Sequence, residues 1–332
     1  MTVSGTVRIL GAMEIRTTYQ DISAENTVDG TVVTIGNFDG VHQGHQTIIK
    51  NCISISQRRA LRCLICTFEP HPAELFAKNK APARLTLPER KQQLLTNMKP
   101  DILLMQQFTR EFAAMNPQHF VEDALVTAMN ARVIVVGKNF RFGKDRAGDI
   151  EFLKTAGQIH GFEVLAEDLL STHHNAVTRS TANQVISSTR IRELIGTGEV
   201  ALAAQLLGRN HELPGTVIRG KQMGREMGFP TLNIAPEKVL IPGDGIYAAV
   251  VDVGTDKQVP AAVYIGNRPT LAHGFSIEAH LFEFSRDAYN DTAVIHFVDK
   301  IRDNRKFENV ELLQLQIAED IDAIRKKLEN NA

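Results

Sequence analysis

The sequence predicts two domains: an α/β domain with a parallel sheet, followed by an antiparallel β-barrel or β-sandwich. A chain of 332 residues holds about two domains at roughly 150 residues each. Up to about residue 186, short β-branched runs alternate with amphipathic stretches, as in a parallel sheet covered on both faces. After Gly208, glycine and proline separate short alternating runs, a pattern typical of antiparallel strands.

The first part of the chain is expected to carry six strands and four longer helices. The strands are short runs rich in valine and isoleucine, and the helices have amphipathic spacing. Asn116 before Pro117 is a signal for a helix start, and Asp149 can cap another helix. The expected strands are 31–35, 61–68, 102–105, 133–136, 162–165 and 183–186, and the expected helices are 43–59, 88–97, 117–129 and 149–161. Ligands of such a sheet bind at the carboxyl ends of its strands.

The second part is expected to be a β-domain closed by one helix. Apolar residues at helical spacing predict that helix at 310–328, packed on the β-domain. Short helices at 189–195 and 199–207 are expected to connect the two parts, so we place the domains at 1–195 and 196–332. The expected strands are 215–219, 246–253, 261–265, 276–284 and 292–297.

Composition limits the partners that the chain can have. The 37 basic and 38 acidic side chains give a net charge of −1, so no overall positive field attracts nucleic acid or an anionic membrane. No apolar run approaches the ~18 residues that a membrane helix needs, and the N-terminus does not resemble a signal peptide. We therefore expect a cytoplasmic protein that binds neither nucleic acid nor membrane.

The three cysteines are expected to be core residues. Cys63 and Cys66 form a C-x-x-C pattern inside the apolar run 61–68, which reads as a buried strand. Positions three apart on a strand point to opposite faces, so zinc binding or dithiol chemistry would need a different local structure. An odd number of cysteines also argues against a secreted disulfide framework.

The most informative segment is 34–46, where a strand ends and a helix is expected to begin near Val41. His42 and His45 are three residues apart in its first turn, so both imidazoles face one side beside unpaired backbone N–H groups. A helix start at the end of a parallel strand favours anions, and histidine donors add hydrogen bonds to phosphate oxygens. The alternatives are a histidine pair satisfied at a helix start, or two ligands of a metal site.

This segment resembles the nucleotidylyltransferases with an H-x-G-H signature. The longer string from Gly36 to His45 resembles the adenylyltransferase half of the bacterial bifunctional riboflavin kinase/FAD synthetase family. The resemblance implies a Rossmann-like α/β domain in which His42 and His45 stabilise the charge that develops at the α-phosphorus of ATP. It also implies ATP binding by the residues around the two histidines, which are Gly36, Asn37, Phe38, Asp39, Gly40 and Gly44.

Three further segments match the same family in order and spacing. The proline-rich loop 68–72 and the segment 136–149 correspond to family segments near the flavin-phosphate site of the adenylyltransferase. The helix start at 186–192 corresponds to the family segment that binds the leaving phosphates. Taken alone, the basic run would be a solvated face and the helix start a cap. The implied flavin-phosphate residues are Pro70, Lys138, Phe140 and Arg141, and the implied ATP residues are Ser187, Ser188, Thr189 and Arg190.

The segment 215–233 is glycine-rich but is not a P-loop, because no G-K-[ST] opens a helix there. It could be a simple hairpin. Its resemblance is to the riboflavin kinase domain, a six-stranded antiparallel barrel with a C-terminal helix, in which a glycine-rich flap approaches ATP. The resemblance implies that Thr231 and Asn233 bind Mg²⁺, a role that suits hard oxygen donors. The other implied ATP residues are Gly220, Lys221, Gly224, Arg225, Gly228 and Pro230.

Glu278 is the expected catalytic acid–base residue of the kinase half. The resemblance implies that its carboxylate accepts the proton of the ribityl 5′-hydroxyl during attack on the γ-phosphorus of ATP. On the residues alone, a glutamate in an alternating run would be a surface residue. The sequence departs from the family pattern at Leu232, Asn290, Asp291 and Asn304.

The resemblance covers the chain from about Thr31 to the last helix and implies two activities. The chain would phosphorylate riboflavin to FMN and then adenylylate FMN to FAD, using ATP in each step and Mg²⁺ in the first. Its partners are then small molecules, and the sequence predicts no oligomeric state. One alternative is an H-x-G-H enzyme with another acceptor, such as nicotinate mononucleotide, phosphopantetheine or an amino acid. Another is a regulatory flavin- or RNA-binding protein with a degenerate kinase fold.

Overall fold

The computed structural model describes residues 13–22, 27–77, 81–168, 185–220, 224, 228–268 and 273–330. Contacts divide them into two compact units. The first unit holds the described residues up to Pro82 and from Pro88 to Ile186, and the second holds Ala83–Leu87 and the described residues from Ser187 onward. The expected boundary at residue 195 falls within a helix of the second unit, so the two units divide nine residues earlier than the sequence suggested.

The first unit contains a six-stranded parallel sheet with the order β1-β4-β3-β2-β5-β6. β2, which was predicted with the same bounds, is buried along its whole length. Of the expected last strand, residues 183 and 184 lie outside the described residues, and Val185 and Ile186 belong to no named strand. The strands are β1 (Glu14–Arg16), β2 (Thr31–Ile35), β3 (Arg62–Glu69), β4 (Ile102–Gln107), β5 (Ala131–Gly137) and β6 (Glu163–Glu167).

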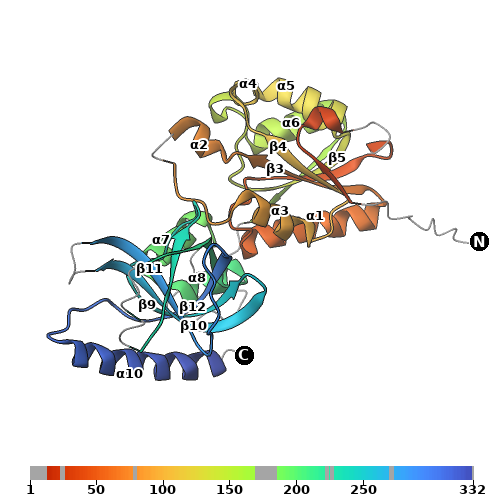
Figure 1. The fold of residues 1–332 in the computed structure, drawn as a ribbon. Coiled ribbons are helices and arrows are strands. Elements are labelled where there is room, and N and C mark those ends of the chain that lie inside the picture. Colours follow the sequence, from red (N-terminus) through yellow and green to blue (C-terminus); the bar gives the residue numbers. More distant parts are fainter. Residues whose placement is uncertain are drawn as a thin grey trace, which may run out of the picture. The chain divides into compact units, whose positions relative to one another are not determined.

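Helices cover both faces of this sheet (Figure 1). Alternate residues of β2 pack on different clusters, Val32 with α1 residues on one face and Val33 with η4 and α6 residues on the other. The expected helix at 117–129 is present, but after one α-helical turn it continues as a π-helix. The helical segments are η1 (Tyr19–Asp21), α1 (Gln43–Arg59), α2 (Pro72–Ala77), α3 (Pro88–Thr96), α4 (Arg110–Ala113), α5 (Pro117–His119), η4 (Phe120–Ala128), η5 (Lys144–Arg146) and α6 (Ile150–His160).

The cysteines are core residues, as predicted. Cys63 packs on the α1 face of β3 and Cys66 on the opposite face, and all three cysteines are buried and free. The Sγ atoms of Cys52 and Cys63 lie 3.6 Å apart, and burial raises the pKa of Cys66 to about 12. Such thiols are poor nucleophiles.

The second unit is a closed antiparallel barrel with the strand order β10-β11-β8-β7-β12-β9. β8 was not expected as a strand, because the sequence around it reads as a glycine-rich loop. The strands are β7 (His211–Ile218), β8 (Leu232–Pro236), β9 (Gly245–Val253), β10 (Asp256–Arg268), β11 (His273–Leu281) and β12 (Thr292–Arg302), and the helices are α7 (Ser188–Thr197), α8 (Val200–Leu207) and α10 (Val310–Glu329).

The barrel has one seam that is only partly closed. β8 pairs with β11 through only two residue pairs, Asn233 with Glu278 and Leu232 with Ala279. On its other side β8 continues to pair with β7 as far as Pro236. β8 and β11 therefore separate beyond the pair Asn233–Glu278, in the direction of Pro236 on β8.

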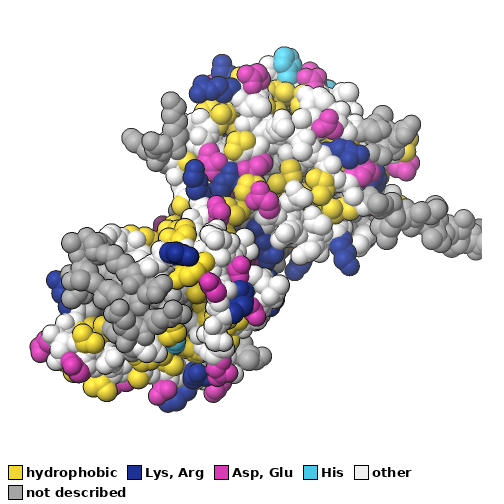
Figure 2. Space-filling view, in the orientation of Figure 1, with side chains coloured by type: hydrophobic (Ala, Val, Ile, Leu, Met, Phe, Trp, Pro, Cys, Tyr) yellow, Lys and Arg dark blue, Asp and Glu magenta, His cyan; other side chains and the backbone are white. Residues whose placement is uncertain are grey.

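Charged side chains are interspersed on the surface. On the face seen in Figure 2, the described basic and acidic side chains alternate rather than gather into one patch. The described surface in this view therefore offers local charges to a ligand instead of one extended field.

An ion pair holds α10 to the barrel. Arg302 of β12 donates from Nε and Nη2 to the carboxylate of Asp320, with distances of 2.7–3.1 Å, and Gln316 donates to the same carboxylate at 2.9 Å. Asp320 is only 5% exposed. Ile324 completes the contact by packing against Ala248 and Phe282.

We predict that Asp320→Ala lowers the free energy of opening of α10 by about 3–5 kcal/mol, because it leaves the Arg302 charge half-buried without its carboxylate. Hydrogen exchange of the α10 amides measures this change. Glu319→Ala removes an exposed acid from the same helix and is the matched control. Equal loss of protection in the two variants would show that the ion pair does not anchor the helix.

Candidate active sites

The turn between β2 and α1 is held in a strained conformation. Phe38, Gly40 and Val41 all have positive φ angles, of 47°, 80° and 40°. Left-handed backbone is unfavourable for a β-branched residue such as Val41 and is found mostly at functional sites. Two hydrogen bonds maintain the turn, from Thr67 Oγ1 to the Asn37 carbonyl at 3.0 Å and from the Val41 amide to the Phe38 carbonyl at 3.0 Å.

His42 and His45 lie together at the start of α1, as the sequence predicts. Their rings stack with centroids 3.5 Å apart and planes 17° apart. His42 is the N-cap residue, and its Nδ1 accepts the backbone N–H of His45 at 3.2 Å. Because Nδ1 is an acceptor, the ring proton of neutral His42 is on Nε2, where it can be donated to a ligand.

His45 is held in its neutral form. Burial, together with the neighbouring charge of His42, lowers the pKa of His45 well below its usual 6.5. Its Nδ1 is buried and has no hydrogen-bond partner among the described residues. The ring of Phe38 contacts it edge-on, with centroids 5.2 Å apart.

The other predicted ATP residues of the first unit surround this pair. Gly36, Asn37, Phe38, Asp39 and Gly40 form the strained turn itself, and Asp39 and Phe38 are buried. Gly44 lies close to the His42 ring and to the Ile186 carbonyl, so a side chain there would crowd the histidines. The turn and the histidine pair are therefore one compact site at the carboxyl end of β2.

The predicted residues 187–190 form the start of α7, which belongs to the second unit. Ser187 is its N-cap and accepts the Arg190 backbone N–H at 3.2 Å. Arg190 also pairs with Glu193 at 3.2 Å, while its Nε is buried without a hydrogen-bond partner among the described residues. Ser188 and Thr189 occupy the first turn of the helix.

Lys138, Phe140 and Arg141 line one cavity of about 340 Å³ beyond the end of β5. Each cation has a carboxylate partner: Lys138 pairs with Asp168 at 2.6 Å and Arg141 with Asp149 at 2.7 Å. Asp149 caps α6. The hydrogen bond from the Phe152 amide, and to a smaller extent the hydrogen bond from Arg141, lower the pKa of the Asp149 carboxyl. Pro70 is not in this cavity; it follows β3 after a cis peptide bond.

A row of aromatic rings near the ends of the strands escaped the sequence analysis. Phe76, which is 68% exposed, contacts Phe108, and further phenylalanines continue the row with centroids 5.4–6.1 Å apart. It ends at the cavity beside Arg141. The members, in order, are Phe76, Phe108, Phe112, Phe120, Phe142 and Phe140. They come from separate elements, so no local pattern could have shown that they meet.

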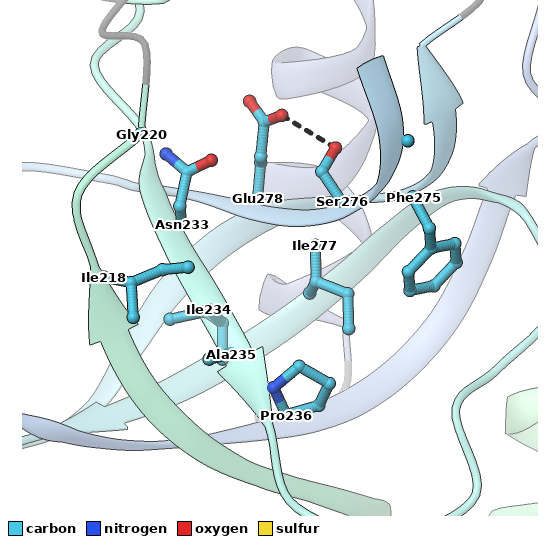
Figure 3. Close-up of a pocket in the computed structure, with 11 residues that line it drawn as sticks. Ile218, Gly220, Asn233, Ile234, Ala235, Pro236, Phe275, Ser276, Ile277 and Glu278 are labelled. Atoms are coloured by element: carbon cyan, nitrogen blue, oxygen red, sulfur yellow. Dashed lines mark hydrogen bonds between the residues drawn. The ribbon is translucent and has the colours of Figure 1, made fainter.

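Glu278 is the centre of the site in the second unit. It is 7% exposed, and its two oxygens accept hydrogen bonds from the hydroxyls of Ser276 at 3.0 Å and Thr231 at 3.4 Å. Asn233 is its partner on β8, and its side chain points to the same side of the sheet (Figure 3). The structure thus brings together the predicted residues Thr231, Asn233 and Glu278, and adds Ser276.

A cavity of about 370 Å³ lies beside Glu278, where β8 and β11 separate. Its polar end is formed by Glu278, Ser276, Asn233 and Gly220, and its remaining wall is largely apolar (Figure 3). That wall consists of Ile218, Ile234, Ala235, Pro236, Gly274, Phe275 and Ile277. The cavity suits a flat apolar ring with a polar tail.

Glycines bring the backbone close to the polar end. A Cβ atom on Gly220 would lie 2.1 Å from Asn233 Nδ2, and one on Gly224 would lie 2.4 Å from the Phe229 carbonyl. Gly228 has a φ of 87°, and Pro230 accepts a hydrogen bond from His280 at 2.8 Å. Lys221 and Arg225 lie outside the described residues.

The departures from the family pattern have visible partners. Leu232 packs against the barrel core, as expected for a side chain that points away from Thr231 and Asn233. Asp291 pairs with Arg286 at 2.6 Å, and Asn304 donates to the Ile265 carbonyl at 2.8 Å. Asn290 has a positive φ of 67° in the turn before β12.

The parallel α/β unit with a histidine pair after β2 and the closed barrel with a nearly buried glutamate together define a two-domain transferase. Comparison with known families gives the same division: the FAD synthetase family matches residues 24–182, and the riboflavin kinase family matches residues 207–328. The chain belongs to the bifunctional riboflavin kinase/FMN adenylyltransferase family. The family matches and the relatives confirm both predicted enzyme activities, in FMN and FAD biosynthesis.

Two curated relatives illustrate the similarity. The bifunctional riboflavin kinase/FMN adenylyltransferase of Escherichia coli K12 is 38% identical over 294 residues, which cover 88% of this chain and 91% of the relative. The protein of the same description from Haemophilus influenzae is 34% identical over 305 residues, covering 91% of this chain and 96% of the relative.

A solved structure shares the two-domain fold. A protein of Streptococcus pneumoniae described as a macrolide-efflux protein matches with a TM-score of 0.80 and 27% identity, over 94% of this chain and 98% of its own. The term efflux belongs to the description of the Streptococcus pneumoniae protein. Among the described helices of the present chain, none is long and apolar enough to cross a membrane.

We predict that His45 makes the protein less stable as the pH falls. Between the usual value of 6.5 and the lower folded pKa of His45, the unfolded chain takes up a proton that the folded chain refuses. The unfolding temperature of the wild type should therefore fall faster from pH 7.5 to 5 than that of His45→Asn. His119→Asn, at an exposed histidine, should keep the wild-type slope. Parallel curves for wild type and His45→Asn would contradict a buried neutral ring.

Proposed function

We propose that the two reactions are carried out at the two sites described above. Glu278 serves the phosphorylation of riboflavin, and His42 with His45 serves the adenylylation of FMN. The observation that carries the proposal is the Glu278 carboxylate, which accepts hydrogen bonds from Ser276 and Thr231, is the strand partner of Asn233 and lies beside a cavity with an apolar wall.

In the kinase step, the Glu278 carboxylate accepts the proton of the riboflavin 5′-hydroxyl while its oxygen attacks the γ-phosphorus. Such a base contributes typically ~10²–10⁴ in rate. The carboxylate is nearly buried and receives two hydroxyl hydrogen bonds, which hold it in place. The apolar wall of the cavity suits a flat heteroaromatic ring, a feature that riboflavin and ATP share.

The residues beside Glu278 fit a magnesium ion. Thr231 and Asn233 offer a hydroxyl and an amide oxygen, which are hard donors, and Gly220 leaves space against the Asn233 amide. The described residues hold no group of three or more His, Cys, Asp or Glu that could bind a metal, so phosphates and water would complete the shell. When bound, Mg²⁺ neutralises charge on the transferring phosphoryl group.

In the adenylylation step, the FMN phosphate is already a dianion near neutral pH, so no strong base is needed. His42 donates from Nε2 towards the phosphate chain of ATP, and the strained turn of residues 36–40 holds it in place. We assign the binding of the leaving phosphates to Ser187, Ser188, Thr189 and Arg190. We assign the binding of the flavin phosphate to Pro70, Lys138, Phe140 and Arg141. Positioning and charge stabilisation then carry most of the rate.

The aromatic row supplies a place for the flavin ring in the adenylylation step. Phe76 is largely exposed and lies four residues after Pro72, next to the proline-rich loop. Stacking on an exposed aromatic ring is available to any flat heteroaromatic ligand. The free, buried cysteines also agree with a protein that works in the reducing cytoplasm.

We predict that the two activities are separable by mutation. Purified protein with riboflavin, ATP and Mg²⁺ should yield FMN first and FAD afterwards, followed by chromatography. His42→Ala with His45→Ala should stop FAD formation and leave FMN formation, because only one site loses its donors. Glu278→Gln should stop phosphorylation of riboflavin and leave the adenylylation of supplied FMN.

The matched controls are His119→Ala and Glu283→Gln, which alter exposed residues of the same types. Both should keep both activities. Loss of both activities in either site variant, with the protein still folded, would contradict the division of labour. A failure of the wild type to form any flavin nucleotide would contradict the proposal as a whole.

We predict that Phe76→Ala raises the KM for FMN about tenfold in the adenylylation step and leaves riboflavin phosphorylation unchanged, because one stacking surface is lost. Initial rates with supplied FMN measure the effect. Ile159→Ala removes an exposed apolar side chain elsewhere in the first unit and should change neither KM. An unchanged KM for FMN in Phe76→Ala would place the flavin away from this row.

A further inference from the structure

The two oxygens of Glu278 are held unequally. Ser276 donates to Oε1 at 3.0 Å, whereas Thr231 donates to Oε2 at 3.4 Å. The first distance is that of a good hydrogen bond and the second lies near the upper limit. Ser276 therefore fixes the carboxylate more firmly than Thr231 does.

The position of Ser276 follows from the register of β11. Ser276 and Glu278 are two residues apart on one strand, so both side chains point to the outer face of the barrel. The intervening Ile277 points to the core and is 2% exposed. β10 pairs with both positions, Gly266 with Ser276 and Tyr264 with Glu278, so the hydroxyl and the carboxylate are carried by a fixed backbone.

We propose that Ser276 is a positioning residue for riboflavin phosphorylation, which holds Oε1 of Glu278 and thereby presents Oε2 to the substrate hydroxyl. This inference rests on the proposed role of Glu278 as the base. The last torsion of a glutamate side chain is broad and roughly two-fold, so a carboxylate without such a bond rotates freely. With Oε1 engaged, one orientation remains.

The assignment of Oε2 follows from the two hydroxyls. Thr231 is also the proposed cation ligand, and its hydroxyl can offer a lone pair to a cation while its proton points to Oε2. A carboxylate oxygen can accept more than one hydrogen bond, so Oε2 can receive the substrate hydroxyl in addition to the Thr231 hydroxyl. In the reaction the substrate O–H bond breaks, its proton passes to Oε2, its oxygen bonds to the γ-phosphorus, and the bond from that phosphorus to ADP breaks.

The titratable neighbours of the carboxylate are few among the described residues. The register places Tyr264 of β10 opposite Glu278 and His280 two residues further along β11, on the same outer face. His280 donates from Nδ1 to the Pro230 carbonyl at 2.8 Å, and β8 contributes the neutral residues Thr231 and Asn233. Variants at Tyr264 and His280 are therefore controls for the removal of the Ser276 hydroxyl.

The test is Ser276→Ala in the full chain, assayed for riboflavin phosphorylation and, with supplied FMN, for FAD formation. We expect kcat of the kinase step to fall roughly tenfold, the rate equivalent of one hydrogen bond to a charged group, while KM for riboflavin and ATP stays unchanged. FAD formation should be unaffected.

Three further variants sharpen the test. Ser276→Thr, which keeps the hydroxyl and suits a strand, should restore kcat. Thr292→Ala removes an exposed hydroxyl from β12 and should behave as wild type in every assay. Tyr264→Phe and His280→Gln should not lower kcat in the way that Ser276→Ala does.

The outcomes separate this inference from the proposal beneath it. If Glu278→Gln abolishes phosphorylation while Ser276→Ala keeps the wild-type kcat, Ser276 does not position the base. A raised KM with unchanged kcat would make Ser276 a substrate contact and would also overturn the inference. If Glu278→Gln retains full activity, the proposed base itself is wrong.

Discussion

The first unit depends on one tight connection, the turn that joins the buried strand β2 to helix α1 across residues 36–42. β2 lies between β3 and β5 in the sheet, so its end has a fixed position. The chain must reverse there without a long loop, and it does so with left-handed backbone at Phe38, Gly40 and Val41. The imidazole of His42 then takes the capping role that a serine or aspartate has at most helix starts, so the residue proposed to bind the nucleotide also caps the helix.

In the second unit, the alternation of a single strand separates core from chemistry. Ile277, Ala279 and Leu281 of β11 face the barrel core, while Ser276, Glu278 and His280 face outward. A shift of one residue in register would bury the carboxylate and expose the core, so the packing that closes the barrel also selects which face carries the reactive group. Stability and catalysis therefore constrain the same nine residues.

The structural features that could be predicted from the sequence are those marked by a local sequence pattern. The runs that became β2 and α1 carry strong periodicity, and the histidine spacing placed both rings correctly. β1 is three residues long and pairs with β4 nearly ninety residues away, so no local pattern marks it. The short helix α7 is amphipathic, and only tertiary packing decides which unit buries it. Ser276 could have been found by following the outward face of Glu278 along its strand, whereas the aromatic row joins segments that are far apart in sequence.

The partly open seam between β8 and β11 links ligand binding to the rigidity of the barrel. Closed barrels gain stability because every strand is hydrogen-bonded on both sides. Here the pairing between β8 and β11 ends after two residue pairs. A molecule lodged in that gap touches both strands and bridges them where the protein does not. Any ligand held in that gap would therefore join β8 to β11, and its binding would raise the free energy of unfolding of the barrel.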